Sequence, residues 1–493
     1  MKKLLTTITI VACLVSCSKI LSDDPVTIKV ENETPSLQEQ AVMIPETEEA
    51  VTFAVNEKDI RAFVNRIEKD RKIRKIESIQ RENKPLVYVV NYDKGWTIFS
   101  SDKHLPPILA ENPEGSFDVN RLDNPGVNEW LEGITEATRL ARKDCSRKTA
   151  NENTDLWEGE KIAVNDVSLE KDSQVIIPKK LSSNFRWTKV LIDQETRRDT
   201  IQHLGPLVIT QWGQGSPWWN KLPVYSGSNH YPTGCVAVAL SQLLYYYNHK
   251  IGVPSGLYHN VIVSGWDLYH DWAYNYSYYK STLTRSGMTD PSNRWNNMLL
   301  SSNDTSHERK SSYVSDLMVD VGNRVDMEYD ATGSGSSSTF DKAYSALAYY
   351  GLQATAGPFQ ETEVVSSLTN GCPLYIRGGK PLGGGGHAWV LDGFIQYTYT
   401  EVDTYIWLIG YSAQWGGEGK TQEEAREAAE AAGYDKPEDG MTTTEIVNYG
   451  PYKQYHMNWG WDGDCDGYYT ESAVVSGTQY SKNQKLMYNI RRR

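Results

Sequence analysis

The pattern of apolar residues first becomes regular after Asn56, where they recur at the spacing of one helix face: Ile60, Phe63, Val64 and Ile67. Asn56 is a favourable N-cap, so we expect a helix to begin beside it. Two runs of β-forming residues follow, Leu86–Val90 and Trp96–Phe99, and the segment between them ends in Gly95, which predicts a hairpin. With a second helix expected over residues 128–142, this region is predicted to be a small α+β module.

A second module is predicted from about residue 201, and it holds most of the tryptophan and glycine. The stretch Val236–Tyr247 is apolar almost all round, which is typical of a buried helix. The residues that follow His387 (Ala-Trp-Val-Leu) predict a strand. Residues 421–432 are strong helix formers with acidic residues first and Gly433 behind them, so we expect a helical surface insertion there.

The first residues predict export. Lys2 and Lys3 precede an apolar run over residues 4–15, which has the length of a signal-peptide core and is too short to span a bilayer. Residues 14–17 (Leu-Val-Ser-Cys) resemble a bacterial lipobox, so lipid on Cys17 is expected to anchor the exported protein to a membrane, at the outer membrane or cell surface. An ordinary signal peptide that contains a cysteine is the alternative. No later run of apolar residues is long enough to predict a transmembrane helix.

Composition narrows the class of protein. Charged residues make up 23% and hydrophobic residues 39% of the 493 residues, which is enough for a large buried core. The net charge of −13 argues against a nucleic-acid-binding protein. The chain has 31 tyrosines and 15 tryptophans but 8 phenylalanines, and rings with a polar atom suit wet grooves and surfaces.

These features divide the chain into five predicted segments: a lipoprotein signal peptide (1–16), a flexible linker (17–50), the α+β module (51–145), a polar linker (146–200) and the large second module (201–493). Dibasic pairs at 179–180 and 197–198 are natural sites of proteolysis if the polar linker is exposed.

Six cysteines are too few for a disulfide scaffold in a chain of this length, and no pair has the C-x-x-C spacing of a zinc or redox site. Spacing leaves open whether Cys372 and Cys465 pair. Cys235 differs in its neighbours, because Pro232 and Gly234 close the preceding loop and the buried helix follows at once. The helix dipole and free N–H groups favour a thiolate there, which predicts a nucleophile; a structural cysteine is the alternative.

His387 is the second candidate. The four glycines at 383–386 allow another segment to approach its backbone closely. A histidine at the start of a strand beside such a loop is well placed as a general base or as the imidazolium partner of a thiolate. A structural histidine is the alternative.

Two further segments supply polar groups that suit the same chemistry. Asn458 can hydrogen-bond the far nitrogen of an imidazole, and Trp459 can shield that bond from water. The side-chain amide of Gln214 is a suitable oxyanion donor if it lies beside the thiol. A turn with core tryptophans explains the segment around Asn458 equally well when it is taken alone.

Gln, Cys, His and Asn-Trp follow one another in the order found in papain-like cysteine peptidases, although the local papain signature at the cysteine is absent. The segments themselves resemble the streptopain family: Gln214–Pro217, Thr233–Ala237, Asp316–Tyr329, Gly386–Ala388 and Asn458–Trp461. The first module is similar to the propeptide of that family at residues 95–103, 107–109 and 115–118. The resemblance covers most of residues 50–493 and implies an α+β fold, a papain-like catalytic domain with a helix layer and an antiparallel sheet, behind an inhibitory propeptide.

The resemblance implies a role for each matching residue. Cys235 is the expected nucleophile, His387 the acid/base and Gln214 an oxyanion donor. Asn458 and Trp459 are expected to orient and shield His387, while Ser334 and Gly386 line the substrate cleft. The implied protein is a zymogen that acts on proteins or peptides without a metal or other cofactor, forms an acyl-enzyme on Cys235 and favours a hydrophobic residue just before the cleaved one.

The chain departs from the family pattern at three places. The segment between Gly393 and Asn458 is longer than the usual connection, and the loop after Tyr329, which contains Ser334, is one residue shorter. The linker before residue 200 is extended, so the family's maturation site cannot be transferred. Lys180 and Arg198 are the candidate cleavage sites.

Other classes of function remain open at this stage. A surface glycan-binding lipoprotein is the main rival, since sugars stack on aromatic faces, and it predicts binding that does not depend on Cys235. An inactive peptidase kept as a binding module is disfavoured because every catalytic position is filled. A glycosidase needs two carboxylates across a cleft, which the sequence does not place.

Overall fold

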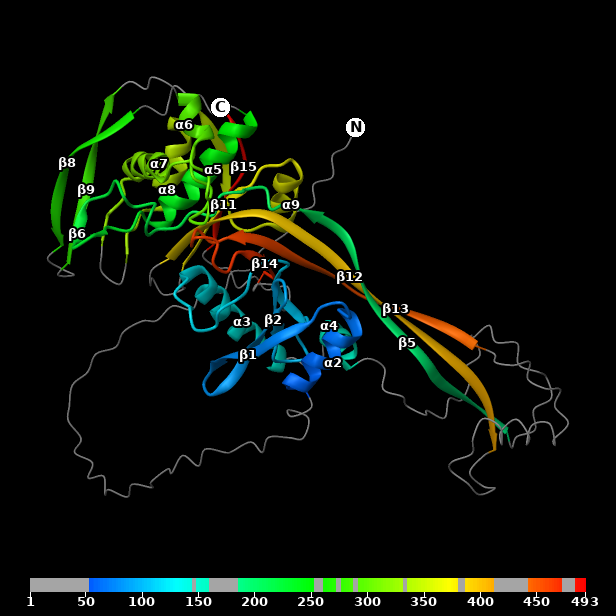
Figure 1. Cartoon of the computed structure of the whole chain (residues 1–493). Helices are drawn as coiled ribbons and strands as arrows, with labels where there is room; N and C mark the ends of the chain where they lie inside the picture. The colour runs from blue at the N-terminus through cyan, green and yellow to red at the C-terminus, as the bar shows by residue number, and fades with distance from the viewer. Residues whose placement is uncertain are drawn as a thin grey trace, which may run out of the picture. The chain divides into compact units, whose positions relative to one another are not determined.

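The computed structural model describes residues 53–143, 148–158, 185–251, 260–271, 276–286, 291–330, 335–379, 386–411, 442–471 and 484–493. Figure 1 shows how their helices and strands are arranged. The predicted signal peptide with Cys17, the candidate cleavage site Lys180, the cleft residue Ser334 and the predicted helix 421–432 lie outside the described residues.

Residues 53–158 are called the N-terminal module below. Its elements are α2 (Glu57–Ile67), β1 (Ile73–Arg81), β2 (Lys84–Tyr92), β3 (Trp96–Ser100), β4 (Ile108–Asn112), α3 (Pro125–Lys143) and α4 (Lys148–Glu158). The helix predicted after Asn56 is α2, and the Asn56 side chain caps it by accepting hydrogen bonds from the N–H groups of Lys58 (2.8 Å) and Asp59 (3.2 Å). The predicted hairpin is β2 and β3, which pair antiparallel, and the second predicted helix is α3.

Helix α4 lies in the segment that the sequence predicts to be linker (146–200). Its residues Leu156 and Trp157 are buried, and the Trp157 ring lies 5.0 Å from the ring of Phe63 in α2. Two adjacent large apolar side chains are enough to attach this short helix to the core of the module. Residues 148–158 are therefore helix rather than linker.

The rest of the described chain contains the elements from β5 onward: β5 (Phe185–Leu204), β6 (Val224–Ser226), β7 (Asn229–His230), α5 (Cys235–Ile251), β8 (Asn260–Asp271), β9 (Tyr276–Ser286), α6 (Pro291–Asn296), α7 (Ser311–Arg324), α8 (Phe340–Tyr349), β10 (Leu352–Gly357), α9 (Glu361–Thr369), β11 (Leu374–Gly379), β12 (Gly386–Tyr411), β13 (Thr442–Asn458), β14 (Gly467–Tyr469) and β15 (Lys485–Arg492).

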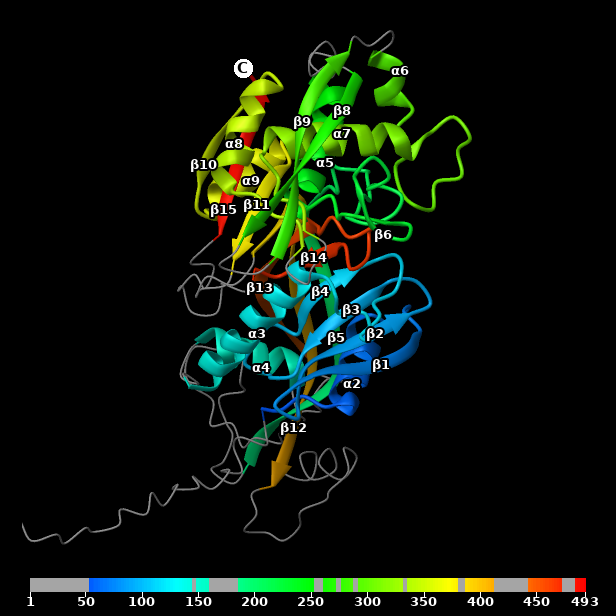
Figure 2. The same cartoon turned by 90° about the vertical axis from the view of Figure 1, so that its left-hand side faces the viewer.

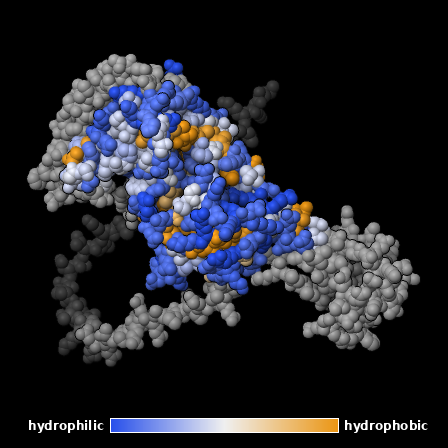
Figure 3. All heavy atoms as spheres, viewed as in Figure 1, coloured by the Kyte–Doolittle hydropathy of each residue, from blue (hydrophilic) through white to orange (hydrophobic). Residues whose placement is uncertain are grey.

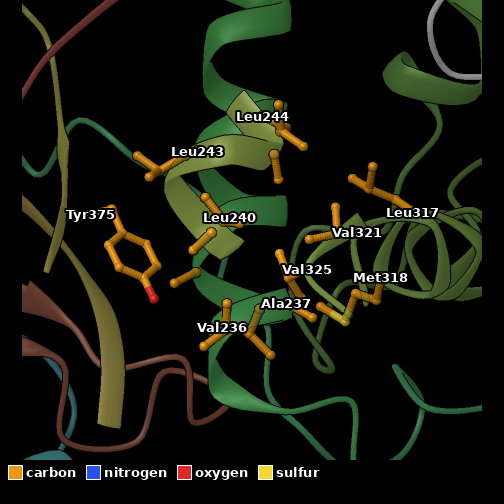
Figure 4. Close-up of a cluster of buried hydrophobic side chains, with 14 of the residues drawn as sticks. Val236, Ala237, Leu240, Leu243, Leu244, Leu317, Met318, Val321, Val325 and Tyr375 are labelled. Carbon is orange, nitrogen blue, oxygen red and sulfur yellow. The ribbon is translucent and has the colours of Figure 1, made fainter. Parts of the chain in front are cut away.

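Helix α5 forms the centre of the helix layer. It is apolar on nearly every side, as the sequence predicts, and it packs against both α7 and the sheet. Figure 4 shows Leu240 and Leu244 of α5 between Tyr375 of β11 on one side and Val321 of α7 on the other. Because α5 is held on two sides, its first residue, Cys235, has a fixed position relative to the sheet.

Within the described residues, one antiparallel sheet of 11 strands joins the two regions of the chain. Its order is β1-β2-β3-β4-β14-β13-β12-β11-β15-β10, with β5 paired to β12. The N-terminal module enters through β4, whose Ala110 and Glu111 pair with Tyr469 and Tyr468 of β14. Figure 2 shows β1–β4 of the module below β13 and β14, and the helices around α5 above them. The α+β architecture predicted for the chain is confirmed.

Strand β5 begins at Phe185 and pairs with β12 along its whole length, from Phe185 opposite Tyr411 to Leu204 opposite Phe394. Residues 185–200 are therefore strand, whereas the sequence predicts linker. We call the three-stranded part of the sheet formed by β5, residues 394–411 of β12 and residues 442–454 of β13 the arm (Figure 1). Residues 394–411 and 442–454 of the arm belong to the long connection between Gly393 and Asn458 that the sequence marks as unusual.

The surface agrees with the acidic, polar composition. Figure 3 shows a face that is largely hydrophilic, with hydrophobic residues in small separate patches. No helix in the described part of the chain is long and apolar enough to cross a membrane.

Candidate active site

Cys235 is the first residue of α5, and the loop before it is shaped by Gly234. The φ of Gly234 is +85°, and a Cβ there would lie 2.8 Å from the sulfur of Met327. Glycine is needed on both grounds, because other residues rarely adopt this φ and no side chain fits. The tight turn delivers the Cys235 thiol to the N-terminal end of a buried helix.

The thiol faces the start of β12. Its sulfur accepts hydrogen bonds from the N–H groups of Ala388 and Val236, and the guanidinium of Arg377 on β11 lies near enough to favour a thiolate. Burial outweighs these effects and raises the pKa of Cys235. In this form of the protein the thiol is therefore neutral at pH 7, although the groups that favour the thiolate are in place.

His387 is the second residue of β12, in the strand that the sequence predicts, and its ring is buried. Nε2 donates a hydrogen bond to the carbonyl oxygen of Trp459 (2.8 Å), which leaves Nδ1 without a proton in the neutral ring. The ring stacks on Trp389, with centroids 5.8 Å apart, and meets the edge of Trp461 at 6.2 Å. Burial lowers the pKa of His387 to about 4, against the opposing effect of the Trp459 carbonyl, so the ring is neutral at pH 7.

Cys235 and His387 lie on opposite sides of β12. Ala388 and Val390 belong to the buried cluster that contains α5, whereas Trp389 and Leu391 belong to the cluster that contains α3. Side chains alternate along a strand, so His387 points with Trp389 toward α3. Among the described residues, the recorded hydrogen bond of the His387 ring goes to Trp459 and not to Cys235. The structure brings the two segments together but does not join their side chains.

The start of α3, in the N-terminal module, covers His387. A Cβ on Gly126 would lie 2.9 Å from Cδ2 of His387 and 2.3 Å from Cε3 of Trp459. The absence of a side chain at Gly126 therefore lets the helix backbone rest directly on both rings. In this arrangement the module and the thiol lie on opposite sides of His387.

Asn458 does not orient His387 in this form. Its Nδ2 donates to the carbonyl oxygen of Thr210 (2.7 Å), and its Oδ1 accepts from Nε2 of Gln242 (2.9 Å) and from the N–H of Gly460 (3.3 Å). Asn458 therefore ties the segment after β13 to α5, while the backbone carbonyl of Trp459 takes the place expected for the Asn458 side chain.

Gln242 is a site residue that the sequence analysis missed. It is fully buried two turns after Cys235 on the same helix, and its Oε1 accepts from the Thr210 hydroxyl (3.1 Å) and the N–H of Trp212 (3.3 Å). It thus connects α5 to the segment before Gln214 and to Asn458. A polar residue seven positions after the cysteine, inside a helix that is otherwise apolar, is the signal that could have identified it.

The other predicted residues take the following positions. The backbone carbonyl of Gln214 accepts a hydrogen bond from the N–H of Thr233 (3.1 Å), which places the Gln214 segment beside the loop that carries the thiol. Trp459 is buried, with its ring 5.1 Å from that of Trp389, next to His387. Gly386 pairs with Gly379 at the exposed start of β12.

Titratable groups also support the Trp459 backbone. Oδ1 of the buried Asp466 accepts a hydrogen bond from the N–H of Trp459 (2.8 Å), and burial raises the pKa of Asp466 to about 7. His456 pairs with Asp392 (Nδ1 to Oδ1, 2.6 Å), and this pairing raises the pKa of His456 even though burial opposes it. The Trp459 backbone is therefore held by a carboxyl group, Asp466, whose pKa lies near 7.

The described residues contain no group of three or more His, Cys, Asp or Glu side chains placed to hold a metal ion. Cys235, Cys372 and Cys465 are free thiols, so Cys372 and Cys465 do not pair.

Comparison with known proteins identifies both regions of the chain. Residues 212–423 match the Peptidase C10 family, and residues 48–138 match the Spi protease inhibitor family. Together the two matches cover more than half of the chain. The chain belongs to the Peptidase C10 family. It is a cysteine endopeptidase, and an N-terminal inhibitor domain keeps it as a zymogen; the predicted resemblance to the streptopain family is confirmed.

Several known proteins are similar to this peptidase. Streptopain of Streptococcus pyogenes serotype M1 is 25% identical over 364 residues, which cover 70% of this chain and 77% of streptopain. The thiol protease/hemagglutinin PrtT of Porphyromonas gingivalis is 23% identical over 318 residues, 61% of this chain and 30% of that protein. A solved fragment of Prevotella intermedia prointerpain A has a TM-score of 0.47 and 20% identity, and covers 84% of this chain and 97% of the fragment.

Proposed function

We propose that this peptidase hydrolyses peptide bonds through the Cys235 thiolate and His387, and forms a thioester acyl-enzyme. The observation that carries the proposal is the position of Cys235, at the N-terminus of a buried helix with N–H groups directed at its sulfur and Arg377 nearby. The thiolate attacks the substrate carbonyl carbon, the protonated His387 gives its proton to the leaving amine, and water then hydrolyses the thioester.

Activation in this proposal requires His387 to change sides. While α3 covers it, the ring is neutral and bonded to Trp459, so no thiolate–imidazolium pair exists. Once the N-terminal module leaves, α3 no longer covers the His387 ring, which can then turn toward Cys235. In the active form Asn458 orients the turned ring, with Trp459 as the shield, and Gln214, beside the Thr233 loop, supplies an oxyanion donor.

We further propose that residues 51–158 form the inhibitory propeptide and that the catalytic domain starts at β5. Cleavage is placed between Glu158 and Phe185, a segment that contains Lys180. Arg198 is a poor cleavage site, because it lies in a paired strand with its side chain bonded to Glu111. Ser334 and Gly386 are proposed to line a cleft that prefers a hydrophobic residue just before the cleaved one.

Lipid attachment to Cys17 completes the proposal. The support is the charged start, the short apolar run and the Leu-Val-Ser-Cys segment at residues 14–17. Cys17→Ser should move the full-length protein from the membrane fraction to the soluble fraction of its host. Retention of this variant in the membrane would overturn the lipid anchor and leave the peptidase proposal intact.

Casein digestion tests the catalytic role. The precursor without residues 1–17, cut between residues 158 and 185 and then freed of its N-terminal module, should digest casein, and Cys235→Ala should remove all measurable activity because no other nucleophile replaces the thiol. Cys372→Ala is the matched control, since Cys372 is also a free, partly buried thiol but is not at a helix N-terminus. Activity that survives Cys235→Ala, or that Cys372→Ala removes, contradicts the assignment.

A further inference from the structure

The arm contacts the N-terminal module at a place separate from Cys235 and α5. Helix α2 packs against β5, and α4 packs against β13. Figures 1 and 2 both show α2 and α4 beside the arm, on the other side of β14 from α5. The module therefore contacts the arm as well as the region over His387.

One hydrophobic cluster of the module is completed by the arm. Tyr397, Tyr399 and Tyr449 of the arm are buried in the same cluster as Phe63 and Trp157 of the module. The rings of Phe63 and Tyr399 meet edge to face, with centroids 6.0 Å apart. Separation of the two parts would expose large aromatic surface on both sides, which opposes dissociation.

A buried ion pair crosses the same interface. Nη1 of Arg198 on β5 donates to Oε2 of Glu111 on β4 (2.8 Å), and Nη2 donates to Oε1, so the pair is bidentate. The Arg198 guanidinium also lies 3.6 Å from the ring centroid of Tyr397. Although burial opposes it, Arg198 holds the pKa of Glu111 below its ordinary value.

A second set of charges crosses in the opposite direction. Arg66 of α2 lies near the carboxylates of Glu401 and Asp403 on β12. Glu401 is held in place by the hydroxyls of Tyr449 (3.1 Å) and Thr196 (3.2 Å), both from the arm. The module thus gives one arginine to the arm and receives one from it, which fixes the orientation of the contact.

Two neutral hydrogen bonds and a strand pairing extend the interface. The Tyr452 hydroxyl donates to Oδ1 of Asn153 in α4 (2.9 Å), and Nε2 of Gln454 donates to the carbonyl oxygen of Ile108 (3.3 Å). Strand β4 continues the sheet from β14. None of these contacts involves Cys235 or His387.

We propose that the arm is a second binding site for the N-terminal module, which retains the module on the catalytic domain after the chain has been cut between Glu158 and Phe185. The occupant is the module itself, residues 53–158. Only its inhibitory consequence rests on the proposed function: the cut zymogen stays blocked until the module itself is degraded. Binding can be measured without any peptidase activity.

The experiment uses the full precursor without residues 1–17, carrying Cys235→Ala so that it cannot digest itself. The recognition sequence of an unrelated site-specific protease replaces part of residues 159–184, and the chain is cut there once. The two fragments should elute together in size-exclusion chromatography at about 1 µM, which requires a dissociation constant below that concentration. Separation of the unmodified fragments at this concentration would overturn the proposal.

Arg198→Ala should raise the dissociation constant at least about thirtyfold, because it leaves Glu111 buried without its partner. Arg197→Ala is the matched control: Arg197 is the next residue of β5, is exposed and pairs with Asp199 on its own strand, so the constant should stay within about twofold. Equal effects of the two variants would contradict the proposal.

A double-mutant cycle separates a lost contact from a misfolded arm. If Arg198 acts through Glu111, Arg198→Ala should weaken binding strongly in the parent but far less when Glu111→Ala is already present. Circular dichroism of the uncut Arg198→Ala precursor should match the parent. An equally large effect of Arg198→Ala on both backgrounds would show that the pair is not the contact and would refute the assignment.

Discussion

The two regions where the N-terminal module touches the catalytic domain are built differently. In the first region, which we call the cleft contact, Gly126 lets the helix backbone rest directly on His387 and Trp459. Along the arm, large rings such as Phe63 and Tyr399 and a buried ion pair fill the interface. The cleft contact keeps the histidine from the thiol, whereas the arm contact joins the two parts through a separate buried aromatic cluster. The residues that cover His387 and the residues that bind the arm are thus different.

The largest effect on stability is expected in the aromatic cluster that the module shares with the arm. Phe63→Ala should destabilise the Cys235→Ala precursor by about 3–5 kcal/mol, because it removes a buried ring that contacts Phe99, Trp157 and Tyr399. Urea denaturation measures the change. Ile446→Ala, at an exposed position of the arm, is the control and should stay within about 0.5 kcal/mol. A Phe63 variant as stable as the control would show that the aromatic cluster at the arm contributes little to stability.

A smaller effect on stability, but a clear one on activity, is expected at the cleft. Gly126→Ala in the uncut precursor with an intact thiol adds a methyl group where no space exists, at a cost of about 1–3 kcal/mol. The start of α3 should move away from His387, and hydrolysis of a fluorogenic peptide should rise roughly 5- to 150-fold. Gly133→Ala adds the same methyl group elsewhere in α3 and should not activate. If Gly126→Ala does not increase hydrolysis, the contact over His387 does not block the chemistry, and the difference between the two contacts is refuted.

The cleft contact should also weaken in acid. The pKa of His387 is lowered to about 4 in the precursor, so the unfolded chain binds more protons than the folded one between about pH 4 and 6.5. This contribution to stability is present above pH 6.5 and is lost as pH falls, by about 1 kcal/mol at pH 5.5.

Asp466 has the opposite sign, since its raised pKa of about 7 makes the folded form bind the extra proton between about pH 4 and 7. The test is therefore a difference: urea midpoints of the Cys235→Ala precursor with His387 and with His387→Gln, at pH 7 and pH 5.5. The His387 protein should lose about 1 kcal/mol more on acidification. Identical losses would mean that His387 is not held as a buried neutral ring.

Local signals in the sequence were enough to predict several elements of the fold and to propose the main site residues. The Asn56 cap, the hairpin ending at Gly95 and the buried helix after Cys235 are formed by neighbours in the chain, so their patterns could be interpreted without a tertiary structure. The Gly234–Cys235 and Gly386–His387 pairs were found for the same reason.

Strand β5 could not be predicted because its inward side chains are polar. Gln194, Thr196 and Arg198 point toward the module and the arm, where they bond to Asp403, Glu401 and Glu111. Residues 193–200 (Asp-Gln-Glu-Thr-Arg-Arg-Asp-Thr) are all polar, so this part of the strand has no hydrophobic alternation and has the composition of a linker. The partners that make this strand stable come from positions more than 80 residues away.

The sequence by itself determined the chemistry available to this peptidase: a thiol at a helix start, a histidine at a strand start and an inhibitory module ahead of them. Only the tertiary structure decided whether they meet. The side of β12 on which His387 lies depends on strand pairing and on the contact with α3. Retention of the module on the catalytic domain depends on buried pairs such as Arg198 with Glu111. Such contacts join residues far apart in the chain, so no local sequence pattern predicts them.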